Sequence, residues 1–261
     1  MGKSHARTCS CICGFIKMNI FSCFYRKTVR FLLLLSTIKL YFLVGKSHVP
    51  RTLVILYSNS DVLKVRDIVR RIRDEQQLGQ TGLGQTNYEA YQIFITTQKT
   101  GKLNGDIAEV GVCSGSSAKL ICEAKGNKIL HLFDTFEGLP SPSGYDDTAM
   151  YSKGYYAWAL EKVKTYLAGY SNVCFYKGLF PDTGKYVSDK VFSFVHLDVD
   201  IYQSTVDCLE FFYPRMNKGG IILSHDYQIS CGVKKAFDDF FIDKQEIIIE
   251  LSGSQCLVVK I

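Results

Sequence analysis

The sequence predicts an α/β fold with a mostly parallel sheet that is closed by an antiparallel C-terminal hairpin. From about residue 52, short apolar runs alternate with stretches of helical periodicity, which is the pattern of a parallel sheet with helices on both faces. The runs are nearly continuously apolar, as expected of strands buried on both sides. The last two runs, 246–251 and 255–261, are joined by Ser-Gly-Ser, and this short connection predicts a hairpin.

The individual elements follow from local patterns. Apolar residues recur at helical spacing in the first charged stretch, as Val65, Ile68, Val69 and Ile72. The predicted helices are 61–77, 87–100, 118–124, 155–169, 204–213 and 231–241, and the predicted core strands are 106–112, 129–134, 173–177, 192–198 and 220–224. Residues 52–57 form a short apolar run, and the glycine-rich stretch 79–86 is expected to be a linker or a flexible lid. This layout is typical of class I methyltransferases, which have a Rossmann-like sheet, and not of the usual dehydrogenase domain.

A glycine loop follows the first core strand. Glu109 precedes Gly111, Gly115 and Ser116, and then a helical stretch begins. Small residues at this place let a ligand approach the backbone. Asp134 ends the next apolar run, and ligands of open parallel sheets bind at the carboxyl ends of the strands. Two acids and a glycine loop at adjacent strand ends suit a nucleoside with ribose hydroxyls, although an ordinary strand-to-helix turn is an alternative interpretation.

The spacing of the loop indicates which nucleoside. A dinucleotide fingerprint needs glycines at positions i, i+2 and i+5, whereas here Cys113 stands at the middle position. An acid just before the loop also disfavours a pyrophosphate. The pattern fits a ligand without phosphates and with a positive centre, such as S-adenosylmethionine.

A second polar cluster follows the fourth and fifth predicted strands. Asp198 and Asp200 are two residues apart, and His225 and Asp226 follow the fifth strand. Like charges held close together repel, so such a cluster favours a bound cation. Oxygen ligands and one imidazole suit Mg²⁺ or Mn²⁺. In the competing interpretation, Asp200 caps the following helix and His225 is only packed.

Several segments resemble the macrocin O-methyltransferase (TylF-type) family of sugar O-methyltransferases. The similar segments are Ala-Glu-Val-Gly-Val from residue 108, Asp-Thr-Phe-Glu-Gly-Leu-Pro from 134, Lys-Gly-Leu-Phe-Pro-Asp-Thr from 177, His-Leu-Asp-Val-Asp-Ile-Tyr-Gln-Ser-Thr from 196, and Ser-His-Asp-Tyr from 224. The resemblance spans about residues 85–245 and leaves out the first 60.

The resemblance implies an S-adenosylmethionine-dependent, divalent-metal-dependent O-methyltransferase. It places Glu109, Gly111, Gly115, Ser116, Asp134 and Asp182 at the cofactor and Asp198 and Asp226 at the metal, with Asp198 and Asp200 as catalytic residues and Asp200 as the candidate base. His225, which the polar cluster adds as a metal ligand, departs from the family pattern, and a degraded metal site is the alternative. Family members often have Asp-Asp-Tyr where this chain has His225-Asp-Tyr. An imidazole in place of a carboxylate weakens Mg²⁺ binding and favours Mn²⁺ or another transition ion.

The resemblance further implies methyl transfer to a hydroxyl of a sugar or glycosylated small molecule. Residues 141–153 and 155–158 are expected to form a lid over this acceptor, with a plain surface insertion as the alternative. Two other classes remain open at this point: an NAD-dependent sugar-modifying enzyme, which would need a different glycine spacing, and a non-catalytic, membrane-tethered binding domain.

The N-terminal segment is strongly basic. Residues 1–60 hold nine Lys and Arg and no Asp or Glu, so removing this +9 from the net charge of +6 leaves −3 for residues 61–261. This balance gives no reason to expect nucleic acid as a partner. The apolar run 31–44, interrupted by Lys39, is shorter than the roughly 20 residues of a spanning helix. A short signal-anchor, a helix lying on a membrane surface and a basic helix packed on the domain are the three interpretations.

The segment 1–50 is therefore treated as a separate basic and apolar region, with membrane association through residues 26–46 as one interpretation, and 51–261 as the methyltransferase domain. Four of the ten cysteines cluster at its start (Cys9, Cys11, Cys13 and Cys23), in a pattern that only weakly indicates zinc. The other six are expected to be free thiols in a reducing compartment, and the protein is expected to be cytoplasmic and to act alone or as a homo-oligomer.

Overall fold

The computed structural model describes residues 60–76 and 87–261. The expectations for residues 1–59, including membrane association through 26–46 and the N-terminal cysteines, lie outside the described residues. The same holds for the glycine-rich stretch 79–86. Within the two described ranges, none of the helices combines the length and the apolar character needed to cross a membrane.

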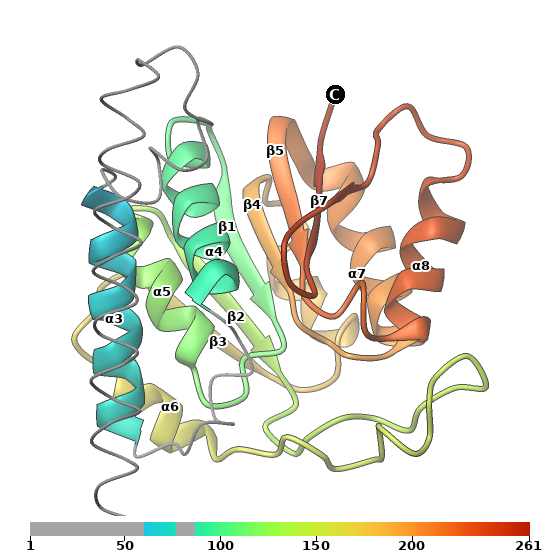
Figure 1. The fold of residues 1–261 in the computed structure, drawn as a ribbon, viewed down its shortest axis with the longest axis horizontal. Coiled ribbons are helices and arrows are strands. Elements are labelled where there is room, and N and C mark those ends of the chain that lie inside the picture. Colours follow the sequence, from blue (N-terminus) through green and yellow to red (C-terminus); the bar gives the residue numbers. More distant parts are fainter. Residues whose placement is uncertain (1–59, 77–86) are drawn as a thin grey trace, which may run out of the picture. The chain divides into compact units, whose positions relative to one another are not determined.

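A sheet of seven strands lies at the centre of the described domain, in the order β3-β2-β1-β4-β5-β7-β6 (Figure 1). The first five strands pair in parallel, and β7 runs antiparallel to both β5 and β6. The strands are β1 Asp106–Val110, β2 Leu130–Asp134, β3 Val173–Lys177, β4 Phe192–Leu197, β5 Met216–Ser224, β6 Ile249–Glu250 and β7 Cys256–Val259. The predicted parallel sheet with a C-terminal hairpin is confirmed.

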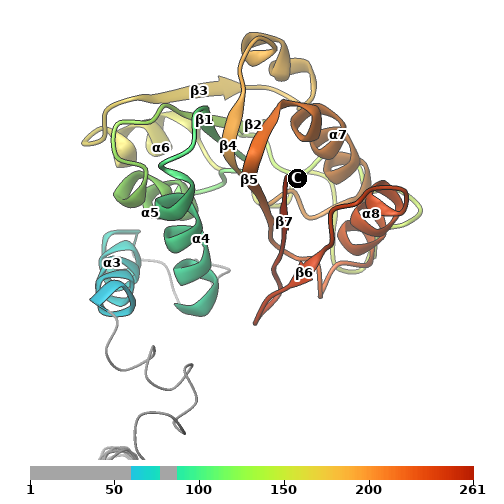
Figure 2. The same cartoon turned by 90° about the horizontal axis from the view of Figure 1, so that it is seen from above.

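Helices cover both faces of this sheet (Figure 2). On one face lie α4, α5 and α6, with α3 packed outside α4 and α5, and on the other face lie α7 and α8. The helices are α3 Ser60–Gln76, α4 Asn87–Thr100, α5 Ser116–Ala124, α6 Leu160–Leu167, α7 Tyr202–Phe212 and α8 Cys231–Phe241, with short 3₁₀ turns η1 Asp182–Val187 and η2 Tyr213–Arg215.

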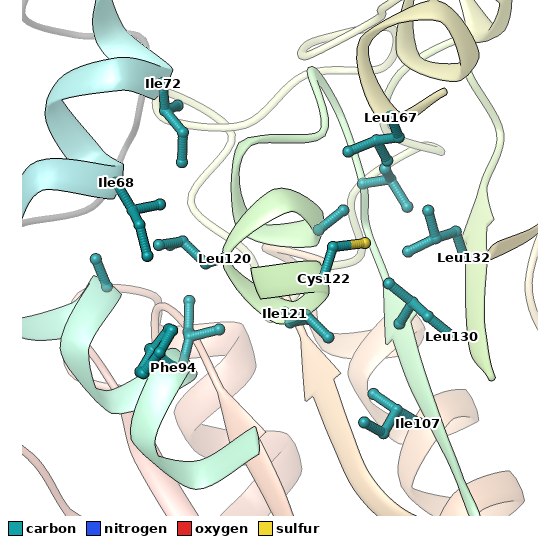
Figure 3. Close-up of a cluster of buried hydrophobic side chains, with 14 of the residues drawn as sticks. Ile68, Ile72, Phe94, Ile107, Leu120, Ile121, Cys122, Leu130, Leu132 and Leu167 are labelled. Atoms are coloured by element: carbon teal, nitrogen blue, oxygen red, sulfur yellow. The ribbon is translucent and has the colours of Figure 1, made fainter. Parts of the chain in front are cut away.

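Alternate residues of each strand build two separate cores. Ile107, Leu130 and Leu132 point to the face of α3–α6 and pack against Ile121 and Leu167 (Figure 3). Their neighbours in the strands, including Ala108, Val110 and Phe133, face α7 and α8. This alternation follows from the two-residue period of a strand, and it fixes which side chains remain at the strand ends to form a site.

Helices α3, α5, α6 and α7 differ from their predicted bounds, and the starts of α6 and α7 bear on the site. Helix α6 begins at Leu160 and not at residue 155, because Tyr155 is held by a backbone hydrogen bond from Leu139 N to Tyr155 O (2.8 Å). Residues 135–159 therefore form one long connection without helix or strand between β2 and α6. Helix α7 begins at Tyr202, two residues earlier than predicted. Both differences concern the connection that borders the site.

Candidate active site

The carboxyl ends of β1, β2, β4 and β5 border one cavity of about 330 Å³. The glycine loop after β1, Asp134 of β2, the Asp198–Asp200 segment and the His225–Asp226 pair all line it, as predicted from the strand ends. The connection 135–159 forms a further wall of the cavity through Met150, Tyr151, Tyr155 and Tyr156. This position agrees with the expectation of a lid over the cavity. The two predicted polar clusters thus share one cavity.

Gly111 allows the ends of β1 and β4 to lie side by side. Its φ is +87°, a left-handed conformation that favours glycine, and a Cβ at this position would lie 1.8 Å from the carbonyl oxygen of Asp198. The glycine is therefore required by close backbone contact with the segment that carries the acids. It brings the glycine loop and the acidic cluster together.

The carboxylate of Asp134 organises the glycine loop. Its Oδ2 accepts hydrogen bonds from the backbone N–H groups of Val112 (2.7 Å) and Cys113 (2.9 Å), and its Oδ1 accepts one from Phe136 N (2.6 Å). Ser116, which also lines the cavity, is held by Ser114 through their hydroxyls (3.0 Å). Burial raises the pKa of the Cys113 thiol to about 11, with a further contribution from Asp134, so this thiol is neutral at physiological pH.

Three residues predicted at the cofactor are not brought to the cavity. Glu109 lies within β1, where its Oε1 is 2.8 Å from His196 Nδ1 of the neighbouring strand β4, and burial raises its pKa. Gly115 caps the start of α5 in a left-handed conformation, close to Val163 of α6. Asp182 is exposed on η1, because the chain after β3 turns at Gly178 and only residues 178–180 reach the cavity.

Asp198, His225 and Asp226 form a compact cluster. Each offers one ligand atom, and these atoms lie within 4.8 Å of one another. His225 Nδ1 lies 2.7 Å from Asp226 Oδ1 and 3.3 Å from Asp198 Oδ1. Burial lowers the pKa of His225, but Asp198 and Asp226 outweigh this effect and raise it to about 11. The cluster thus concentrates negative charge around a point that attracts cations.

Asp200 also lines the cavity, in a left-handed conformation with φ +62°. Burial and the neighbouring Asp198 and Asp226 raise its pKa well above the usual value of an aspartate. The alternative interpretation of Asp200 as a helix cap is wrong. The first amide of α7, Tyr202 N, donates to Asp146 Oδ1 instead (2.7 Å), so the cap comes from the lid.

The lid that the sequence predicts contributes Tyr151 and Tyr156 to the cavity. Tyr151 is buried, and the pKa values of Tyr151 and Tyr156 are raised by burial and by the nearby Asp200 and Asp226. Asp146 holds the lid to α7, and its Oδ2 accepts hydrogen bonds from Ser143 N and Ser143 Oγ (both 2.7 Å). The acid at position 146 was visible in the sequence, but nothing in the local pattern showed which helix it would reach.

Another residue that the sequence did not reveal is Glu89 on α4. Its side chain is buried, and its Oε1 lies 3.8 Å from His225 Nε2. The expected free thiols are confirmed for the six cysteines in the described ranges, of which Cys122, Cys208 and Cys256 are buried.

The strand order, the antiparallel β7 and a cavity at the ends of the parallel strands define a class I methyltransferase fold. Solved structures agree: the O-methyltransferase NovP has a TM-score of 0.57 at 22% identity, covering 66% of this chain and 78% of its own. The calicheamicin methyltransferase CalS11 has a TM-score of 0.57 at 16% identity, covering 76% of this chain and 91% of its own. A methyltransferase of Podospora anserina bound to SAH has a TM-score of 0.52 at 11% identity, with coverages of 83% and 97%.

The family follows from the sequence comparison. The model of the family described as macrocin-O-methyltransferase (TylF) matches residues 56–252, so the chain belongs to this family of S-adenosylmethionine-dependent O-methyltransferases. This result confirms the resemblance found in the sequence motifs.

Two curated relatives come from antibiotic producers. The 8-demethyl-8-(2,3-dimethoxy-alpha-L-rhamnosyl)-tetracenomycin-C 4'-O-methyltransferase of Streptomyces olivaceus is 30% identical over 173 residues, covering 60% of this chain. The chain spans 66% of that relative's length, slightly less than two thirds. The demethyldecarbamoylnovobiocin O-methyltransferase of Streptomyces niveus is 23% identical over 199 residues, with coverages of 70% and 76%.

Proposed function

We propose that the domain 51–261 transfers a methyl group from S-adenosylmethionine to a hydroxyl of a sugar-bearing small molecule, with the help of a divalent cation. The observation that carries this proposal is the shared cavity, in which the glycine loop and Asp134 lie beside the cluster of Asp198, His225 and Asp226. In this proposal, the glycine loop and Asp134 bind S-adenosylmethionine, and the second cluster binds the metal ion. Both ligands carry positive charge, which nearby carboxylates favour.

For the cofactor, the proposal uses Gly111, Ser116 and Asp134. The loop after β1 lines the cavity, and so does Asp134, whose Oδ1 accepts from Phe136 N at 2.6 Å and only at 3.5 Å from the Thr135 hydroxyl. This oxygen has further capacity to accept from ribose hydroxyls. Glu109, Gly115 and Asp182 serve the proposed site only indirectly, through the packing of the strand, helix and turn that carry them.

For the metal, the donor set of two carboxylates and one imidazole fits Mn²⁺ or a related transition ion better than Mg²⁺. A further observation supports this fit. Within the part of the chain that the structure describes, both ring nitrogens of His225 are buried without a hydrogen-bond partner of good geometry. Buried polar atoms of this kind need an explanation, and an ion between His225, Asp198 and Asp226 would supply one.

In the proposed reaction, the residues of this chain align the reactants and manage one proton. S-adenosylmethionine would supply the methyl group on a positively charged sulfur. A divalent cation held by Asp198, His225 and Asp226 would stabilise negative charge on the acceptor oxygen. Asp200 would accept the proton of the acceptor hydroxyl, and its buried position beside Asp198 suits a base that must become protonated during the reaction. Tyr151 and Tyr156 of the lid would hold the acceptor and exclude water.

The choice of a sugar hydroxyl rests on the relatives. The printed name of the Streptomyces olivaceus enzyme specifies a rhamnosyl substituent, and CalS11 is described as a TDP-rhamnose 3'-O-methyltransferase. We therefore propose a rhamnose-type sugar, free or attached to a small molecule, as the acceptor class.

The test compares wild-type protein with Asp198→Ala and the exposed control Asp189→Ala. Calorimetric titration with S-adenosylmethionine and with NAD comes first, and we expect binding of the former only. Formation of S-adenosylhomocysteine is then measured with a panel of rhamnosylated acceptors, in Mn²⁺, in Mg²⁺ and in EDTA. We expect Asp198→Ala to lose metal-dependent turnover while it still binds S-adenosylmethionine within a few fold of wild type.

Each part of the proposal can fail separately. Full activity of Asp198→Ala, or of wild type in EDTA, would exclude the metal role. Binding of neither nucleoside would favour a non-catalytic binding domain.

A further inference from the structure

The proposed reaction leaves one buried acid near the cavity unused. Glu89 lies in the first turn of α4 and its side chain is 5% exposed. Its Oε1 is 3.8 Å from His225 Nε2, whereas the other ring nitrogen of His225 faces Asp198 and Asp226. The imidazole therefore lies between the proposed metal ligands on one side and Glu89 on the other.

The position of the Glu89 carboxylate is fixed by the C-terminal hairpin. Both the backbone N–H and the hydroxyl of Ser254 donate to Glu89 Oε1, each at 2.8 Å. Gly253 makes room for the same oxygen, since a Cβ there would lie 2.6 Å from it. The Glu89 carboxylate therefore has a fixed position inside the protein, unlike a mobile charged side chain on the surface.

The chemistry of metal-binding histidines gives this arrangement a role. A histidine that ligates through one ring nitrogen donates the N–H of the other, commonly to a carboxylate. That carboxylate fixes the tautomer and the orientation of the ring and increases the basicity of the ligating nitrogen. His225 has the matching arrangement, with Nδ1 toward the two aspartates and Nε2 3.8 Å from Glu89 Oε1, a separation that must shorten by several tenths of an ångström before Nε2–H can be donated.

We infer that Glu89 is a positioning residue that receives the Nε2–H of His225, so that Nδ1 presents its lone pair to the metal together with Asp198 and Asp226. This inference rests on the proposed metal site. It assigns the site a preference for Mn²⁺ over Mg²⁺ that depends on the Glu89–His225 pair, because a metal ion that displaces the Nδ1 proton gains a nitrogen ligand only where the imidazole is oriented toward it.

The test measures Mn²⁺ binding to the full-length, metal-free protein by electron paramagnetic resonance, without acceptor or turnover. Pulsed measurements on bound Mn²⁺ report a nitrogen ligand directly. We expect Glu89→Gln to raise the dissociation constant for Mn²⁺ about 10- to 100-fold and to change the nitrogen coupling. We expect His225→Asp to abolish the nitrogen coupling and to bring the affinities for Mn²⁺ and Mg²⁺ closer together.

Glu246→Gln is the matched control. Glu246 is also a buried glutamate that accepts hydrogen bonds, from Tyr213 and Lys260, but its ion pair is with Lys260, whereas that of Glu89 is with His225. We expect its Mn²⁺ affinity to stay within twofold of wild type. If Glu89→Gln does not fold, as judged by circular dichroism, Ser254→Ala replaces it with an expected loss of a few fold.

A double-mutant cycle separates positioning of the imidazole from a general structural effect. In the His225→Asp background, Glu89→Gln should not weaken Mn²⁺ binding, because no imidazole remains to be oriented. An equal loss of Mn²⁺ affinity in both backgrounds would overturn the inference. Wild-type affinity and nitrogen coupling in Glu89→Gln would also overturn it. Neither result would contradict the metal site itself. Wild-type protein that binds no Mn²⁺ would overturn both the inference and the metal part of the proposed function.

Discussion

Position 111 shows how a single residue can decide whether the site forms. The left-handed backbone at Gly111 and its contact with the Asp198 carbonyl hold the end of β1 against the segment that carries Asp198 and Asp200. No side chain larger than hydrogen fits between the two backbones. The acids reach the glycine loop because this position is glycine.

Gly111→Ala is expected to destabilise the domain by about 3–5 kcal/mol, because the left-handed conformation and the steric overlap add to each other. Gly126→Ala is the control: its φ is +60°, but no atom lies within 4 Å of a Cβ there, so about 1 kcal/mol is expected. Urea unfolding measures both. Equal losses in the two variants would show that the overlap with Asp198 is relieved at little cost.

At the residue scale, the sequence correctly predicts that the acids at the strand ends line one cavity, but it wrongly places Glu109 beside them. Asp198, Asp200, His225 and Asp226 each follow an apolar run, and parallel strands end at one edge of the sheet. Glu109 lies inside its strand, on the same face as Ile107, so its side chain points into the layer under α5 and not into the cavity. The role of Glu89 was not predictable, because its partner Ser254 is 165 residues away.

Among the elements, the connection 135–159 has the most direct link to function. Asp146 joins it to the N-terminus of α7 through Tyr202 N, and the ring of Tyr145 packs on that of Tyr202 with centroids 4.5 Å apart. Helix α7 directly follows Asp198 and Asp200. The lid and the segment of Asp198 and Asp200 are therefore connected through the carboxylate of Asp146.

Asp146→Ala is expected to raise the KM for the acceptor about fivefold to tenfold, which corresponds to roughly 1–1.4 kcal/mol of lost lid ordering. The loss of the helix cap should also cost about 1 kcal/mol of stability. Asp147→Ala is a neighbouring control, because its exposed carboxylate bonds only within the lid, to Ala149 N. An unchanged KM in Asp146→Ala would mean that the lid closes without this tether.

The C-terminal hairpin region contains a pH-sensitive contact. Burial raises the pKa of Glu246, but hydrogen bonds from Lys260 and Tyr213 outweigh this and lower it to about 2. The folded pKa is below the unfolded value, so the contribution to stability is complete above about pH 4.5 and is lost as the pH falls toward 2.

Comparison of wild type with Glu246→Gln tests this contact. The variant should be less stable by about 1.5–3 kcal/mol at neutral pH, as expected for hydrogen bonds to a charged group. The difference between the two proteins should shrink as the pH falls below 4.5, measured by denaturant unfolding at several pH values. A difference that is independent of pH would show that the ionised state of Glu246 does not matter.

At this scale the existence of elements could be predicted better than their ends. Helix α8 and strand β3 have the bounds that the sequence predicts, because apolar periodicity and turn residues agree there. The starts of α6 and α7 were misplaced because tertiary contacts from the lid, through Leu139 and Asp146, decide them. A local pattern contains no information about such contacts.

For the whole molecule, the alternation of strands and helices determined the layers, and the final hairpin distinguished a methyltransferase sheet from a dehydrogenase sheet. The strand order around β1 and β4 then places four strand ends at one cavity. The family match begins at residue 56 and therefore leaves out the basic N-terminal segment.

Binding of S-adenosylhomocysteine should stabilise the whole domain, because only the folded sheet brings β1, β2 and β4 together. At 100 times the dissociation constant the expected gain is about 2.7 kcal/mol. Thermal unfolding with and without the ligand measures it, and NAD at the same concentration should cause no shift. A stabilisation of equal size by NAD would contradict the proposed cofactor.

The bond between Glu89 and Ser254 has a consequence for how the protein is made. A ribosome delivers Glu89 165 residues before Ser254, so a nascent chain contains an acidic group that must wait for its donors. Until Ser254 has been added, the growing polypeptide cannot fix the carboxylate that lies behind His225, so this part of the domain folds only after two distant parts of the chain have been made.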